Sequence, residues 1–120
     1  MRSASIEKEM VATLLRHIRR EAEAEDRAVL VAAFRKQVSR ALEEARWSFA
    51  DHFCDKILVE DARNLEAWLV KGHLAWRRFN EPLKALSCFR QVLILGAYDS
   101  SNACVARARS SLQQLLEQLS

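Results

Sequence analysis

The strongest structural signal in the sequence lies in residues 65–95, which read LEAWLVKGHLAWRRFNEPLKALSCFRQVLIL. Spacings of four, three and four place four residues on one helical face: Trp68, Gly72, Ala75 and Phe79. Pro82 follows a polar break, and because proline has no N–H to donate, it suits the first turn of a new helix. Ala85, Phe89 and Val92 then form a second apolar face. The stretch predicts a helical hairpin whose helices approach closely at Gly72.

Composition extends this prediction to the whole chain. With 120 residues, half of them hydrophobic, the chain is long enough for one domain with a modest core. Strands and tight turns use glycine and proline, and the sequence has only two glycines and one proline, so we expect an all-helical fold. Nineteen basic against sixteen acidic residues leave a formal charge of +3. This charge favours acidic partners but falls short of a nucleic-acid-binding surface.

The cysteines and the first residues predict a cytoplasmic protein. Cys54, Cys88 and Cys104 are odd in number and widely spaced, which is typical of a reduced, intracellular chain. Residues 7–9 are charged where a signal peptide would need an apolar run. Because no stretch approaches the length that spans a membrane, we expect no membrane partner.

The N-terminal residues predict a helix of their own, from about residue 5 to residue 23. Its apolar residues cover roughly half of the helical circumference: Ile6, Met10, Val11, Leu14, Leu15 and Ile18. A stripe this wide must be buried, and we expect it to cap the domain by packing on Phe49 and Phe53. A dimer interface and a membrane-surface helix remain as alternatives. We place the boundary to a second helix near Glu25 and Asp26.

The helical face that begins at Trp68 resembles the tetratricopeptide repeat, a hairpin of 34 residues. Counting back by that period from Trp68 leads to Phe34 and defines an earlier unit over residues 31–64, which supports the same resemblance. Lys71 departs from the pattern, since a large apolar residue is usual at its position.

The resemblance implies a right-handed α-α superhelix of about six helices in one domain. Its expected parts are an N-terminal capping helix in residues 1–27, hairpins in residues 31–64 and 65–98, and a C-terminal capping helix in residues 99–120. In such repeats the first helix of each hairpin lines a concave groove. Transferred residue by residue, the groove residues are Arg35, Lys36, Ser39, Leu69, His73, Trp76, Arg77 and Cys104.

The function that this resemblance implies is a non-enzymatic protein-interaction module, an adaptor or scaffold. Leu69 and Trp76 form the expected apolar floor of the groove, and Arg35, Lys36 and Arg77 its basic rim. Such a groove suits an amphipathic helix or an extended peptide with acidic flanks. Alternatively, the chain's own first helix covers the floor. A small chaperone of a bacterial secretion system and a regulatory helical domain remain as other functions, and the protein is expected to be a monomer or homodimer.

No residue pattern points to catalysis, a metal or a cofactor. His17, His52 and His73 fall on three predicted helices, without a cysteine or carboxylate at metal-ligand spacing. Cys54 lies two residues after His52 and therefore points to another side of its helix. Cys54 and Cys88 are interpreted as small core residues. We therefore expect no enzymatic activity and no cofactor.

Overall fold

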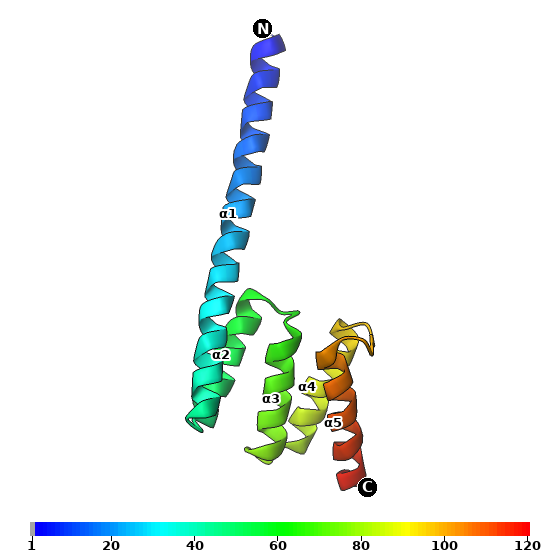
Figure 1. Ribbon diagram of the computed structural model, residues 1–120. Coiled ribbons are helices and arrows are strands. Elements are labelled where there is room, and N and C mark those ends of the chain that lie inside the picture. The colour runs from blue at the N-terminus through cyan, green and yellow to red at the C-terminus, as the bar shows by residue number, and fades with distance from the viewer. Residues whose placement is uncertain (1) are drawn as a thin grey trace.

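The structure is a computed structural model that describes residues 2–120 (Figure 1). Five helices account for the regular structure of these residues: α1 (Arg2–Glu43), α2 (Trp47–Glu60), α3 (Leu65–Arg77), α4 (Pro82–Leu95) and α5 (Ala103–Leu119). The prediction of an all-helical fold is confirmed. The expected number of helices was about six, and the difference arises at the N-terminus.

The two helices expected before residue 46 form one continuous helix, α1. The boundary predicted near Glu25 and Asp26 is wrong, because the backbone stays helical through both residues. The polar run from Glu21 to Arg27 contains no glycine or proline, and its glutamate and alanine residues favour helix. α1 ends instead at Glu43, shortly before Ala45 adopts a positive φ of 57°.

The N-terminal half of α1 projects away from the other helices (Figure 1). Residues 5–30 are exposed throughout, and partial burial begins at Val31. The prediction that this segment packs on Phe49 and Phe53 is wrong, because the uninterrupted helix carries it away from them. Phe49 remains 53% exposed. The apolar stripe of the N-terminal half therefore lies in solvent.

The remaining part of α1 forms a hairpin with α2, and α3 forms a second hairpin with α4. α2 packs on α3 to join the hairpins, and α5 packs on both α3 and α4. Their axes run roughly alongside one another, with α1 and α5 at opposite ends of the row (Figure 1). The N- and C-terminal ends of the chain thus lie far apart.

Buried side chains form a large core among α3, α4 and α5 and a smaller one among α1, α2 and α3. Phe89 is fully buried in the large core. A Cβ atom on Gly72 would lie 2.6 Å from Cε1 of Phe89, so the ring of Phe89 packs against Gly72, where a close approach of the two backbones was predicted. Only glycine leaves room for the Phe89 ring at this helix crossing.

The helix starts follow local side-chain chemistry. Asn64 caps α3, since its Oδ1 accepts a hydrogen bond from the Ala67 N–H at 3.0 Å. Pro82 occupies the first turn of α4, as its missing donor predicts. Asn102 caps α5 in the same way as Asn64 caps α3. Asn64 thus marks the start of the second hairpin, Pro82 lies at its turn, and Asn102 marks the start of the helix that packs on it.

Candidate protein-interaction site

The predicted groove residues of α3 lie beneath or beside α5. Leu69 is buried in the core that α3 shares with α4 and α5, so the expectation of an open floor at this residue is corrected. Trp76 is partly exposed, meets the Phe89 ring edge-on, and donates from its indole Nε1 to Oε1 of Gln118 at 3.0 Å. α5, and not the N-terminal helix, therefore covers this face.

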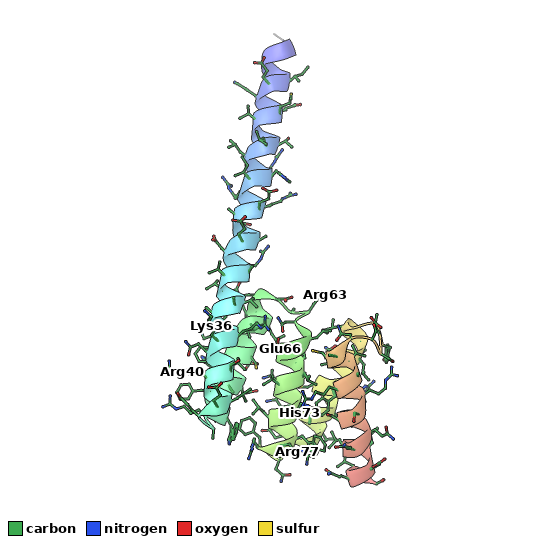
Figure 2. The ribbon with its side chains drawn as sticks, in the orientation of Figure 1. Lys36, Arg40, Arg63, Glu66, His73 and Arg77 are labelled. Carbon is green, nitrogen blue, oxygen red and sulfur yellow. The ribbon has the colours of Figure 1, made fainter. Side chains whose placement is uncertain are left out.

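His73 and Arg77 form a basic corner at the same α3–α5 contact (Figure 2). His73 Nε2 lies 3.4 Å from Ser111 Oγ. Burial lowers the pKa of His73, and the charges of Arg107 and Arg77 lower it further. The Arg77 guanidinium lies 3.6 Å from the centroid of the Trp76 ring, close enough for a cation–π interaction. Burial and the two cations Arg77 and Arg107 therefore favour the neutral form of His73.

A second depression, the α1–α3 groove, lies on the other side of α3. Its lining residues include Arg35, Val38, Ser39 and Leu42 of α1 and Ala67 and Val70 of α3. Within residues 2–120, the α-carbons of α1 and α3 nowhere come within 8 Å of each other, whereas those of α3 and α5 do. The floor is apolar, with Val38 buried and with Leu42 and Val70 partly exposed. The open space of this groove is small, about 50 Å³, and Cys54 and Ile57 of α2 complete its lining.

Charged side chains stand along the α1 edge of this groove (Figure 2). Arg35 Nη2 lies 2.9 Å from Glu66 Oε2, so an ion pair bridges α1 and α3 at the mouth. Both side chains are more than half exposed, so the pair adds little stability. Lys36 is exposed and forms no ion pair within residues 2–120. Lys36 is therefore available to a carboxylate of a partner.

The structure thus divides the predicted site into two regions. Arg35 and Ser39 line the α1–α3 groove, and Lys36 lies at its edge. The other predicted residues belong to α3 or α5 and gather at their contact: Leu69, His73, Trp76, Arg77 and Cys104. Sequence reasoning missed Glu66 and Val70. The available signal for Glu66 was an acidic residue in the first turn of α3 that could form an ion pair with Arg35.

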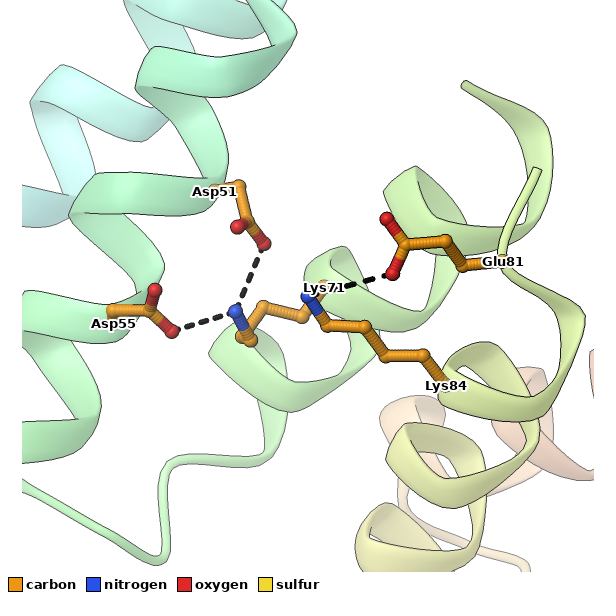
Figure 3. A network of polar contacts seen from close by, with 5 residues as sticks. All are labelled: Asp51, Asp55, Lys71, Glu81 and Lys84. Carbon is orange, nitrogen blue, oxygen red and sulfur yellow. Dashed lines mark hydrogen bonds and ion pairs between the residues drawn. The ribbon is translucent and has the colours of Figure 1, made fainter. Parts of the chain in front are cut away.

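Lys71 joins the two hairpins beneath these surfaces (Figure 3). Its Nζ lies 2.9 Å from Asp51 Oδ1 and 2.6 Å from Asp55 Oδ1, and both acids are one turn apart on α2. Burial of the ammonium lowers the pKa of Lys71, but hydrogen bonds to Asp55 and Asp51 outweigh this and raise it above 10.5. Lys71 therefore stays charged and links α3 to α2 where the tetratricopeptide pattern has an apolar residue.

The cysteines are not poised for reaction. Burial raises the pKa of the Cys54 thiol to about 12. Burial also raises the pKa values of Cys88 and Cys104. Because the thiolate is the reactive form, all three thiols are protonated and weakly nucleophilic near neutral pH.

Among the described residues, no three histidine, cysteine, aspartate or glutamate side chains gather as potential metal ligands. None of the helices in residues 2–120 combines the length and apolar character that crossing a bilayer requires. Comparisons of the chain with family models, with curated proteins and with solved structures give no match.

Proposed function

We propose that this protein is a non-enzymatic protein-interaction module that binds a helix or extended peptide of a partner in the α1–α3 groove. The observation that supports this function is the apolar floor at Leu42 and Val70, which stays partly exposed between two helices that do not close on each other. Apolar depressions with a few polar groups at the edge are typical binding sites for peptide anchors.

The finer architecture belongs to the same proposal. The two hairpins, formed by the second half of α1 with α2 and by α3 with α4, represent tetratricopeptide-like units in a right-handed superhelix, and α5 caps the second unit. The contact of Gly72 with Phe89 supports this assignment, since a small residue in the first helix facing an aromatic residue in the second is what the resemblance implies. α1, α3 and α5 then correspond to the groove-lining helices.

The groove chemistry suggests the kind of peptide that binds. An aliphatic or aromatic anchor of the partner would cover Leu42 and Val70, and its burial would supply most of the affinity. An acidic residue beside the anchor would pair with Lys36, or would displace Glu66 from Arg35. These charges lie at an exposed rim, so they would mainly raise the association rate and make it sensitive to salt.

A peptide selection tests this function with matched variants. Peptides selected from a random displayed library on the wild-type protein would be measured by fluorescence anisotropy against Ser39→Trp, which fills the groove, and Ser87→Trp, which places the same bulk at an exposed position of α4. We expect Ser39→Trp to weaken binding roughly 10-fold or more and Ser87→Trp to leave it unchanged. Equal binding to both variants would place the site elsewhere.

A second measurement addresses the rim. Lys36→Glu should weaken the same peptides at low salt and flatten the dependence of their association rate on ionic strength. Gln37→Glu is the matched control, because it adds an acidic residue at the neighbouring exposed position of α1. If both variants behave alike, Lys36 is not part of the recognition surface.

A further inference from the structure

We propose that the projecting half of α1 binds an amphipathic helix of a different protein, one whose apolar residues are flanked at both ends by lysine or arginine. The surface involved is the N-terminal stripe: Ile6, Met10, Val11, Leu14, Leu15 and Ile18. Each of these side chains is more than half exposed. Contiguous apolar surface of this kind is rare on monomeric proteins and marks an interaction site. The stripe is separate from the α1–α3 groove, and the proposal does not depend on that groove.

The chain's own domain does not cover this stripe. α1 packs on α2 through its second half, where Phe34 meets Phe53. At about 100° per residue of a straight helix, Leu14 lies about 160° around the axis from Phe34. Residues 5–30 are helical and exposed throughout, and this segment projects beyond the other helices (Figure 1). The stripe therefore meets its partner outside the chain.

Three carboxylates lie along the middle of the stripe. Glu7, Glu21 and Glu25 each fall within about 20° of Leu14 around the helix axis. The lysines and arginines of residues 5–30 all lie about 120° or more from Leu14: Lys8, Arg16, Arg19, Arg20 and Arg27. The apolar face of this segment thus carries acidic side chains but no lysine or arginine.

These carboxylates bracket the apolar residues. Glu7 and Glu21 lie at the two ends of the stripe, about 21 Å apart at about 1.5 Å per residue. Within residues 5–120, Glu7 and Glu25 form no ion pair, and Glu21 pairs with the exposed His17 at 3.0 Å. A partner helix with cations about four turns apart, on either side of an apolar stretch, would match both the apolar and the charged parts of this face.

The same carboxylates disfavour a second copy of this chain as the partner. An antiparallel pair centred on Leu14 would place Glu7 of one copy opposite Glu21 of the other. A parallel pair in register would place each of these glutamates opposite its own counterpart. Both arrangements bring like charges together, and such contacts select against a partner. The complementary charge therefore comes from a different chain.

A bilayer surface is disfavoured for a related reason. The stripe would have to enter the boundary between headgroups and acyl chains, and three carboxylates would enter with it. Charged groups lose favourable hydration there, and anionic headgroups repel them. A protein helix with lysine or arginine at the matching positions avoids both costs, because each carboxylate gains an oppositely charged partner.

The size of the stripe predicts a small interface. Its six side chains, each a little over half exposed, offer roughly 600 Å² of surface. A single helix that covers most of this area would form an interface near the boundary between transient and stable complexes. We therefore expect reversible binding with a dissociation constant in the micromolar range.

A peptide selection tests the chemistry of the partner. The probe is a displayed library of helical peptides with a fixed apolar seam and random residues at all other positions. It would be selected on the full chain carrying Ser39→Trp, which fills the α1–α3 groove, after depletion on the same protein with Leu14→Asp/Ile18→Asp added. We expect the selected peptides to carry lysine or arginine about four turns apart, one on each side of the seam. Selected peptides without this basic enrichment would overturn the proposal.

Matched charge reversals test the face itself. Affinities of the selected peptides would be measured by fluorescence anisotropy against Glu7→Lys/Glu25→Lys and against Glu9→Lys/Glu23→Lys. The second pair is the control, because it makes the same change in charge about 140° or more from Leu14. At low salt, we expect the first pair to weaken binding roughly 10-fold or more and the control roughly 2-fold or less. Equal effects of the two pairs would refute the assignment.

Circular dichroism would compare the helix content of each variant with that of wild type. If Glu7→Lys/Glu25→Lys loses helix, Glu7→Gln/Glu25→Gln decides instead, since it removes the charges without reversing them. Unchanged peptide affinity of this neutral variant would overturn the proposal.

Two measurements on the wild-type chain separate the other occupants. Light scattering coupled to gel filtration reports its mass at high micromolar concentration, and flotation with anionic phospholipid vesicles reports membrane binding. We expect a monomer that does not float. A dimer abolished by Leu14→Asp/Ile18→Asp would assign the stripe to a second copy, and flotation abolished by the same variant would assign it to a membrane surface. Either result would overturn the proposal.

Discussion

Replacing Lys71 by methionine tests whether a buried ion pair holds the two hairpins together. Methionine keeps the length of the side chain but removes the charge, so Asp51 and Asp55 lose their partner. Breaking a fully buried pair costs about 3–5 kcal/mol, whereas an exposed pair is worth about 0–1 kcal/mol. Lys71 is 8% exposed, but Asp51 is 21% and Asp55 57% exposed, so water compensates part of the loss. We therefore expect a loss of about 2 kcal/mol in the free energy of unfolding.

Urea unfolding monitored by circular dichroism measures this loss, and a thermal melt should show a Tm lower by roughly 10 °C. The control is Lys84→Met, because Lys84 pairs with Glu81 at 3.8 Å on the surface and both side chains are more than 40% exposed (Figure 3). This control should change the free energy of unfolding by less than about 0.5 kcal/mol. A double-mutant cycle of Lys71→Met with Asp51→Asn should give a coupling of about 1 kcal/mol.

The same pair predicts a dependence on pH. Because the folded pKa of Lys71 is raised, its contribution is fully present below the unfolded value near 10.4 and is lost as the pH rises through the folded value. The difference between wild type and Lys71→Met should therefore be constant from pH 7 to about pH 10 and shrink above it. A Lys71→Met protein as stable as wild type, or no more affected than Lys84→Met, would refute the reasoning.

Three further predictions concern α3. The pKa of His73 is lowered in the folded protein, so folding disfavours the charged imidazole and wild-type stability should fall as the pH drops below 6.5. His73→Gln should make stability depend less on pH in thermal melts between pH 7 and pH 5. Gly72→Ala should cost about 1–3 kcal/mol in urea titrations through the clash with Phe89, and an additional Phe89→Leu should make the alanine less costly. Trp68→Ala should cost about 2–3 kcal/mol in the free energy of unfolding. Trp68 donates from Nε1 to the Ala62 carbonyl at 3.0 Å, but it is partly exposed, so the loss should be smaller than for a fully buried tryptophan. A loss below about 1 kcal/mol would contradict its role in packing.

The helical hairpins could be predicted because their signals are local. The spacing from Trp68 to Phe79 and the position of Pro82 each constrain a single turn or face, and α3 and α4 begin where these signals place them. The course of α1 could not be predicted in the same way. A wide apolar stripe requires a covering surface but does not say whether that surface belongs to the same chain, and the polar run near Glu25 favours helix as readily as a turn.

The candidate interaction surface was predicted less well because it depends on tertiary packing. The resemblance to the tetratricopeptide repeat predicted Leu69 and Trp76 on one face of a helix, and both lie on α3. The extent to which α5 closes over that face depends on packing that sequence spacing does not encode. Lys71 illustrates the same limit. Its position looked like a departure from the pattern, and only the approach of Asp51 and Asp55 from α2 explains a lysine there.

The projecting half of α1 also determines how the molecule moves through solution. The radius of gyration is 19.9 Å and the longest dimension 74 Å, whereas a compact chain of this length would have a radius of gyration of about 14 Å. An elongated particle diffuses slowly for its mass and elutes early from a sizing column. A single copy would therefore elute at the volume of a larger globular protein, and mass measured by scattered light, rather than elution volume, separates one copy from two.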